Sequence, residues 1–244
     1  GERVLLARAE DGALVSIAFD GDAAALADYW PPMGLDRIEV QGSAPVPALS
    51  LAAEAGSRDS LIRLESELGL FAAEHLASAV AVHAAIIKAD GRVIVLPGES
   101  MSGKSTLCFA AHAAGHTVLS DEYVLVDPVT GLVRGWPRSL RLRVDGQWVR
   151  LGIAQEHEPL AVDLVAAITY DHRAPSGAGL VGVEPMSAGE VAMLLIANTV
   201  CAQPRPEDTL RAASALARTT DGIAAQRGEA ELALAELVQR ASAP

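Results

Sequence analysis

The residues of this sequence with the clearest chemical purpose surround two glycines, Gly98 and Gly103. Such glycines let a loop turn its backbone N–H groups toward phosphate oxygens. Lys104 adds a mobile ammonium for the β- and γ-phosphates, the Ser105 hydroxyl can ligate Mg²⁺, and Thr106 supports the start of the next helix. We therefore predict a nucleotide-binding loop, with a chance glycine-rich turn as the alternative. The segment matches G-x-x-x-x-G-K-[ST] throughout, as Gly98-Glu99-Ser100-Met101-Ser102-Gly103-Lys104-Ser105.

An acidic pair, Asp121 and Glu122, follows a short apolar segment, Thr117–Leu119, that is typical of a strand. In doubly wound sheets the ligand lies outside the carboxyl ends of strands. We predict that the pair faces the γ-phosphate, with Asp121 as general base for an attacking hydroxyl. Ser105, Asp121 and Glu122 are the predicted ligands of Mg²⁺. A solvated acidic turn is the alternative.

The elements that must position these groups follow from the apolar pattern. Val82–Lys88 and Val93–Leu96 predict a hairpin across the turn Ala89-Asp90-Gly91, and its second strand leads directly to Gly98. Lys104–Ala114 predicts a helix that ends at Gly115. A buried strand before the loop and a helix after it are the setting that the motif requires.

In the N-terminal part of the chain the pattern of apolar residues is less specific. Arg3–Ala9 and Leu14–Asp20 predict two strands joined by a turn, and Leu61–Leu64 also has the composition of a strand. We expect a small α+β lobe over residues 1–70 and the catalytic domain over residues 71–244.

In the second half, Val162–Tyr170 predicts a strand, and Ser187–Val200 predicts a helix with Ser187 as N-cap and Glu190 three residues later. The chain from Pro206 onward is expected to be mostly helical.

Charge and composition exclude several classes of protein. The formal net charge of -12 argues against a general nucleic-acid-binding surface. No apolar run is long enough to span a membrane and no signal peptide is evident, so a cytoplasmic location is expected. Cys108 and Cys201 are expected to be small core residues. The basic residues that cluster follow the loop, at Arg134, Arg138, Arg141, Arg143 and Arg150.

Three segments in one order resemble the catalytic core of HPr kinase/phosphorylase: the run that begins at His83, the loop at 98–105, and the stretch from Gly115-His116 to Asp121-Glu122. The resemblance implies an α/β fold with a P-loop kinase core, related to phosphoenolpyruvate carboxykinases, that uses ATP and Mg²⁺ to phosphorylate a serine hydroxyl. It implies that Asp121 is the base and that His83 approaches the phosphates. It also suggests a homo-oligomer. A core histidine is the alternative for His83.

The sequence departs from that family at three places. Thr106 stands where the family usually has Glu, Glu122 replaces the second Asp, and the later E-I-R-G-x-G segment of the phosphorylase reaction is absent. Phosphorylase activity is therefore not expected.

The segment 137–143 resembles shorter relatives of HPr kinase that act beside peptide-modifying enzymes, including kinases of lasso peptide precursors. Arg138, Arg141 and Arg143 could clamp a nucleotide phosphate or a substrate carboxylate, or lie on a solvated edge strand. The leading hypothesis is a peptide or small-protein serine kinase that uses Lys104, His83, Arg138 and Asp121. A small-metabolite kinase and a nucleotide-sensing module without catalysis are the alternatives.

Overall fold

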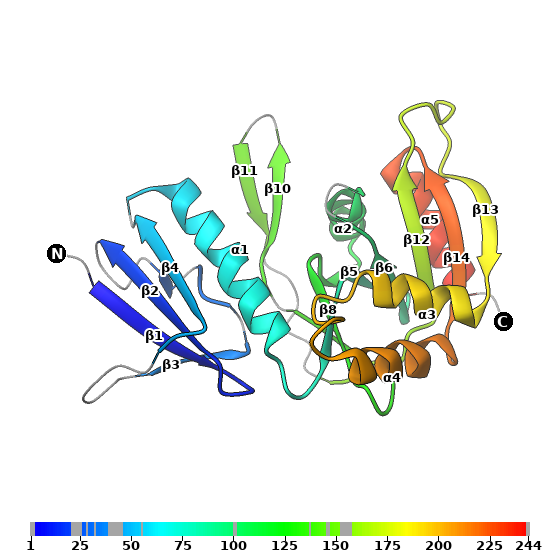
Figure 1. Cartoon of the computed structure of the whole chain (residues 1–244). Coiled ribbons are helices and arrows are strands. Elements are labelled where there is room, and N and C mark those ends of the chain that lie inside the picture. Colours follow the sequence, from blue (N-terminus) through cyan, green and yellow to red (C-terminus); the bar gives the residue numbers. More distant parts are fainter. Residues whose placement is uncertain are drawn as a thin grey trace. The chain divides into compact units, whose positions relative to one another are not determined.

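The chain forms two compact units, Gly1–Ser78 and Ala79–Pro244, each built on a mixed β-sheet (Figure 1). The computed structural model describes residues 3–20, 26–27, 29–31, 33–38, 46–54, 56–99, 102–136, 138–144, 147–151 and 158–242. At residues 3, 141–144 and 147–151 the description covers the backbone alone. The expected boundary at residue 70 falls inside helix α1 (Arg58–Glu74), which belongs to the first unit.

The first unit is a sheet with the strand order β3-β1-β2-β4, accompanied by α1. The predicted hairpin is confirmed, because β1 and β2 pair antiparallel from Arg3 opposite Phe19 onward. Gly12 takes a positive φ of 93° at its turn, where glycine is favoured. The strands are β1 (Arg3–Ala9), β2 (Leu14–Asp20), β3 (Leu35–Ile38) and β4 (Leu49–Glu54).

The predicted strand at Leu61–Leu64 is wrong, because these residues lie on α1. Ser57 caps this helix by accepting a hydrogen bond from the Ser60 N–H. Leu61, Leu64 and Leu68 are all buried, and their spacing of three and four residues places them on one helical face.

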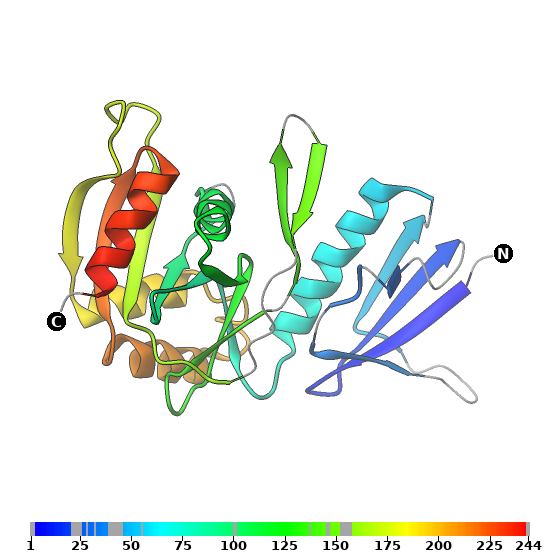
Figure 2. The same cartoon turned by 180° about the vertical axis from the view of Figure 1, so that it is seen from behind.

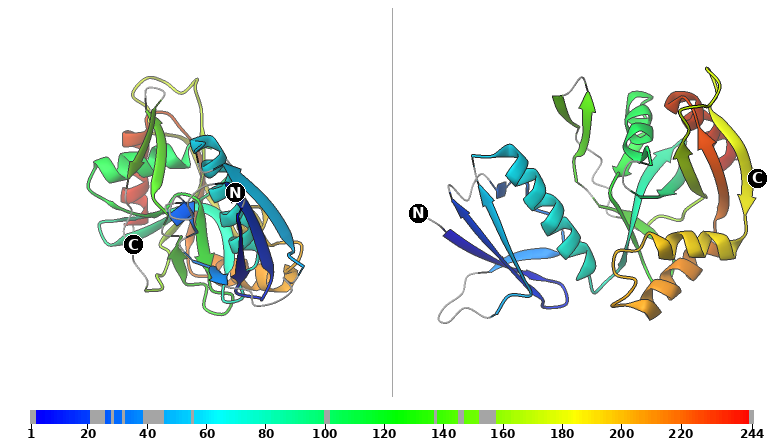
Figure 3. Two further views of the ribbon diagram at one scale, coloured as in Figure 1. Left: turned by 90° about the vertical axis from the view of Figure 1, so that its left-hand side faces the viewer. Right: turned by 45° about the horizontal axis from the view of Figure 1, so that its top comes forward.

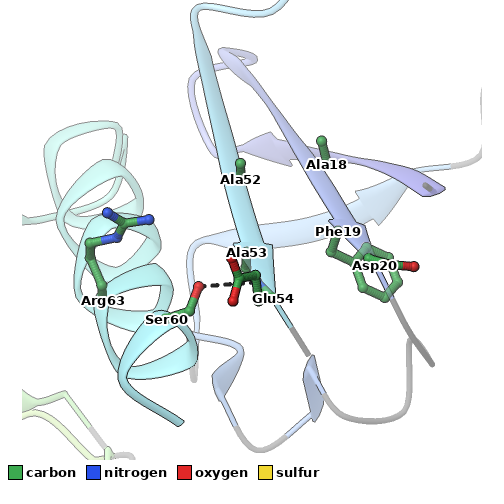
Figure 4. Close-up of a pocket in the computed structure, with 8 residues that line it drawn as sticks. All are labelled: Ala18, Phe19, Asp20, Ala52, Ala53, Glu54, Ser60 and Arg63. Carbon is green, nitrogen blue, oxygen red and sulfur yellow. Dashed lines mark hydrogen bonds between the residues drawn. The ribbon is translucent and has the colours of Figure 1, made fainter. Parts of the chain in front are cut away.

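A cavity of 440 Å³ lies in the first unit between β2, β4 and α1 (Figure 4). The Ser60 hydroxyl beside it accepts a hydrogen bond from the Glu54 N–H at 3.0 Å. The charged residues that line it, Asp20, Glu54 and Arg63, are exposed to solvent.

The sheet of the second unit has the order β13-β14-β12-β6-β5-β8-β9, with β7 paired to β5. Strands β6, β12 and β14 are parallel. Strand β7 runs in the same direction as β6, because both are antiparallel to β5. The carboxyl ends of these four strands therefore meet at one edge of the sheet. The strands are β5 (Val80–Ala89), β6 (Arg92–Pro97), β7 (Thr117–Ser120), β8 (Tyr123–Val126), β9 (Val133–Gly135), β12 (Leu164–Tyr170), β13 (Leu180–Met186) and β14 (Asp221–Arg227).

The predicted hairpin before the loop is confirmed as β5 and β6. Asp90 and Gly91 take φ values of 51° and 80° at its turn, as a tight two-residue connection requires. Val93 to Pro97 are all buried, which fits a strand covered on both faces.

Helices cover both faces of this sheet (Figures 1, 2 and 3). Helix α2 (Lys104–Ala113) and helix α5 (Ala230–Ala241) share a core with Ala85 and Ile87 of β5. The alternate residues of β5, such as Ala84 and Ile86, share the other core with α3 (Ala188–Ala197) and α4 (Pro206–Ala217). This alternation is what a strand between two helical layers requires.

The predicted helices at the loop and at Ser187 are confirmed. Helix α2 begins at Lys104, and Gly115 follows its end with a φ of 83°. Ser187 and Glu190 form a capping box at the start of α3. Cys108 and Cys201 are buried, as expected.

The chain after Pro206 is mostly helical, but strand β14 lies between α4 and α5. Strands β10 (Leu140–Val144) and β11 (Gln147–Leu151) form a separate hairpin, and Leu140 packs into the core beside α2. Among the residues that the structure describes, no helix is both long and apolar enough to cross a membrane.

Candidate functional site

The predicted loop connects the end of β6 to the start of α2, as the motif requires. Gly103 is the N-cap of α2 with a φ of 96°, and none of the described side chains caps this helix end. The N–H groups of its first turn are thus available for an anion, with the partial positive charge of the helix N-terminus. The Gly98 N–H donates to the carbonyl of His83, which ties the loop to β5. Ser100 and Met101 lie outside the described residues.

Lys104 lies across the loop rather than in solvent. Its side chain is 7% exposed, and Nζ donates hydrogen bonds to the Gly98 carbonyl at 2.6 Å and the Glu99 carbonyl at 2.8 Å. Burial lowers the pKa of Lys104, while the negative charge of Asp121 opposes this shift. The ammonium is held where a phosphate chain in the loop would meet it.

Asp121 lies directly after β7 and faces the loop. The Ser105 hydroxyl donates a hydrogen bond to Asp121 Oδ2 at 3.2 Å. Burial raises the pKa of Asp121 above its ordinary value, while Arg138 and the hydrogen bond from Ser105 act in the opposite direction. Its other oxygen, Oδ1, is buried and has no hydrogen-bond partner within the described part of the chain.

Arg138 joins the two acidic residues. Its Nη2 forms an ion pair with Glu122 and lies 3.9 Å from Asp121 Oδ1. Trp136 is buried and positions Arg138, because the Arg138 N–H donates to the Trp136 carbonyl at 2.7 Å. The Trp136 ring packs edge-on against Tyr123, with the centroids 5.5 Å apart. Trp136 is thus a core residue beside the site.

His83 lies on β5 opposite Tyr123, in the strand beside the loop. Its pKa is lowered from 6.5 to about 4, first by burial and then by the positive charges of Lys104 and Arg138. The imidazole is thus neutral at pH 7 and lies near both cations. The strand register and these two charges support the prediction that His83 belongs to the site.

The oxygen atoms beside the loop suit Mg²⁺, which prefers carboxylates, hydroxyls and phosphates. The Ser105 hydroxyl and Asp121 Oδ2 lie 3.2 Å apart, so a hydroxyl oxygen and a carboxylate oxygen are already adjacent at the loop. Within the described residues, no three His, Cys, Asp or Glu side chains converge on a common metal position. A site that takes most of its ligands from nucleotide phosphates and water needs no such cluster.

Of the other predicted arginines, Arg134 lies on β9 with its charge near Asp127. Arg141 and Arg143 lie on β10, where their side chains fall outside the description. Arg138 is therefore the predicted arginine that the described side chains place in the site.

Two residues beside the loop were not predicted from the sequence. Arg227, at the end of β14, is 4% exposed and donates to the Gly103 carbonyl at 3.5 Å. Its guanidinium also lies over the ring of Tyr170, at the end of β12, 4.9 Å from the centroid. The position of Tyr170 at the carboxyl end of a predicted strand was a usable signal. Arg227 gave no such signal, since β14 itself was missed.

Comparisons with known proteins give likenesses to solved structures alone. No family model and no curated protein matches the chain. Among solved structures, the Hpr(Ser) kinase/phosphatase from Coxiella burnetii matches with 13% identity and a TM-score of 0.34, over 65% of this chain and 91% of that one. The match names the family that the sequence segments resemble.

Proposed function

We propose that this protein is an ATP- and Mg²⁺-dependent kinase that transfers the γ-phosphoryl group to a serine hydroxyl of a peptide or small protein. The observation that carries the proposal is the hydrogen bond between Ser105 of the loop and Asp121. It joins a phosphate-binding loop to a buried carboxylate, which are the two parts that phosphoryl transfer to a hydroxyl requires.

The two oxygens of Asp121 suit two tasks. Oδ2 lies against the Ser105 hydroxyl, on the side where Mg²⁺ would be held with Glu122 nearby. Oδ1 is free of hydrogen bonds among the described residues and can accept the proton of the substrate hydroxyl. Burial raises the pKa of Asp121, which makes it a stronger base than an exposed carboxylate.

The cations of the site suit stabilisation of the transferred group. Lys104 would exchange its loop carbonyls for β- and γ-phosphate oxygens, and Arg138 lies close enough to Asp121 to contact the phosphoryl group as it moves. Mg²⁺ would neutralise charge on the phosphates. As the serine oxygen bonds to the γ-phosphorus, its proton passes to Asp121, the bond to the bridging oxygen breaks, and ADP leaves.

The choice of a peptide substrate rests on the net charge of the protein and on the arginine-containing segment 137–143. With a net charge of -12, the protein would repel a strongly acidic protein partner, and this slows association. The segment 137–143 resembles that of kinases acting on lasso peptide precursors, so a precursor with a C-terminal serine is the first candidate.

The proposal is tested by incubating the protein with Mg-ATP and peptides that end in serine, followed by mass spectrometry. We expect a gain of about 80 Da, the mass of one transferred HPO₃ group. Matched peptides that end in alanine serve as the substrate control, and the Lys104→Ala protein as the enzyme control.

A nucleotide sensor is the second candidate function, because Arg138 already forms an ion pair with Glu122 and lies within 3.9 Å of Asp121. A sensor would bind ATP saturably, but it would form neither a phosphopeptide nor ADP with any acceptor added. A small-metabolite kinase would form ADP with an acidic metabolite in place of a peptide. Absence of mass gain in every peptide, with ATP still bound, would reject the peptide kinase and favour these two.

A further inference from the structure

A cavity of 680 Å³ opens beside Gly103 and Thr106, where the loop becomes helix α2. Its far side is formed by the ends of β12 and β14, at Tyr170 and Arg227. Because β6, β12 and β14 are parallel, their carboxyl ends meet at the same sheet edge as the loop. The cavity therefore adjoins the C-terminal end of the phosphate loop, at Gly103 and Thr106.

The strand order fixes the direction in which a nucleotide would extend. Asp121 follows β7, which pairs with β5 on one side of β6, while β12 and β14 lie on the other side. With the γ-phosphate beside Asp121, the rest of the nucleotide extends across the first turn of α2 toward β12. Thr106 is in that turn and lines the cavity.

The charges of the cavity favour a neutral ligand group that is rich in hydrogen-bond donors. Three carboxylates, Asp171, Glu229 and Glu231, face one guanidinium, that of Arg227. This balance repels further phosphate groups, but it suits sugar hydroxyls and amino groups, which donate to carboxylates. Tyr170 is 57% exposed, so ring surface is accessible for stacking.

Arg227 connects the cavity to the loop. It donates to the carbonyls of Gly103 and Gly228, while its guanidinium lies over Tyr170. We propose that this cavity holds the nucleoside half of the nucleotide, with the sugar hydroxyls on the carboxylates and the base against Tyr170. The proposal rests on the proposed function, because it requires the loop to bind the phosphates.

A second cavity of 530 Å³ lies on the α3 side of the loop. Apolar side chains such as Ile168, Leu194 and Ala197 line it together with the polar side chains of Thr169 and Asn198, and it adjoins Gly98 and Glu99. Tyr170 lines both cavities, so the acidic groups are what distinguishes them. The second cavity touches the loop at Gly98, Glu99 and Ser102 and not at Thr106, and Glu99 is the one carboxylate among the described residues of its lining, against three in the first cavity. This difference makes it a matched comparison.

The test measures binding of Mg-ATP and of Mg-tripolyphosphate by calorimetry in two variants. Ser176→Trp places an indole at an exposed position that lines the first cavity, and Ala197→Trp does the same in the second. We expect Ser176→Trp to weaken ATP binding by about tenfold or more, equal to the loss of about 1.4 kcal/mol, and to leave tripolyphosphate binding unchanged. Ala197→Trp should change neither.

A third variant, Asp171→Asn, removes one of the carboxylate charges without changing the size of the side chain. The asparagine oxygen can still accept the hydrogen bond that Asp171 accepts from the Arg173 N–H. Asp171→Asn should weaken ATP binding several-fold without weakening tripolyphosphate binding. Because this substitution is small, the result tests the cavity even if the tryptophan variants misfold.

Two results would overturn the nucleoside assignment and leave the proposed function standing. The first is that Ala197→Trp loses ATP binding while Ser176→Trp keeps it, and the second is that the wild type binds ATP and tripolyphosphate with equal affinity. If the wild type binds neither ligand, the proposed function itself fails.

Discussion

The two units of the chain differ in what they bury. Of the six buried polar or charged side chains among the described residues, Glu65 lies in the first unit and five lie in the second. Four of those five, Lys104, Ser120, Asp121 and Arg227, surround the phosphate loop or the strand end beside it. Burying charge costs stability, so their concentration at one place indicates that function, rather than stability, keeps them there.

Apart from Glu65, the charged side chains described in the first unit are at least partly exposed to solvent. The cavity in Figure 4 is lined by exposed charged residues and small apolar ones, while the core of the unit is apolar. Substitutions at the buried polar groups of the second unit should therefore have larger effects than comparable substitutions elsewhere. The predictions below compare residues of the site with matched positions outside it, and the glycine pair compares the two units directly.

The largest expected effect is that of Lys104→Ala. Loss of the ammonium across the loop should lower phosphotransfer by roughly 10²–10³-fold or more, because a preorganised charge at the phosphates is removed. The matched control is Lys88→Ala, which removes the only other lysine of the chain. A kinase assay in which both variants lose activity equally would contradict a special role for Lys104.

Asp121→Asn should have the second largest effect on phosphotransfer. We expect phosphotransfer to fall by roughly 10²–10⁴-fold, the range for loss of a general base, while ATP still binds. Because burial raises the pKa of Asp121, its ionised form costs stability at neutral pH. The variant should therefore unfold at a higher temperature than the wild type at pH 7. Unchanged turnover would show that Asp121 is not the base.

Two glycines allow the same substitution in the two units. Gly103→Ala would place a Cβ against the Arg227 guanidinium at a φ of 96°, whereas Gly12→Ala meets nothing within 4 Å at a φ of 93°. The strain of a left-handed residue alone costs about 1–2 kcal/mol. Chemical denaturation should show this cost for Gly12→Ala and a larger one for Gly103→Ala, which should also lose ATP affinity. Equal costs would mean that Arg227 moves aside without penalty.

The smallest expected effect concerns His83 and pH. Its pKa is about 4 in the folded protein and 6.5 when exposed, so only the unfolded chain takes up a proton between these values. The stability that neutral His83 provides is complete above pH 6.5 and decreases as the pH falls toward 4.

His83→Gln should flatten this part of the profile of unfolding free energy against pH. His112→Gln, at an exposed position on α2, should leave the profile unchanged. If the two variants behave alike, His83 is not buried beside the two cations.

The sequence was informative where structure is local. The loop, the β5–β6 hairpin and the capping box at Ser187 depend on residues a few positions apart, and all were predicted. Leu61–Leu64 was misassigned, because a short apolar run fits a strand and one turn of a buried helix equally well.

Strand β14 and Arg227, which were not predicted, depend on contacts between residues far apart in the sequence. Strand β14 is poor in β-branched and aromatic residues, with Ile223 alone among them, so only its pairing with β12 and β13 makes it a strand. Arg227 consequently gave no sign that it lies beside Gly103, 124 positions earlier in the chain.

The central claim, that this loop binds a nucleotide for transfer, is tested most directly by calorimetric titration of ATP with Mg²⁺ into wild-type protein and Lys104→Ala. We predict one saturable site in the wild type, weaker binding when Mg²⁺ is chelated, and little or no binding in the variant. Equal affinity in both proteins, or no binding to the wild type, would contradict the claim.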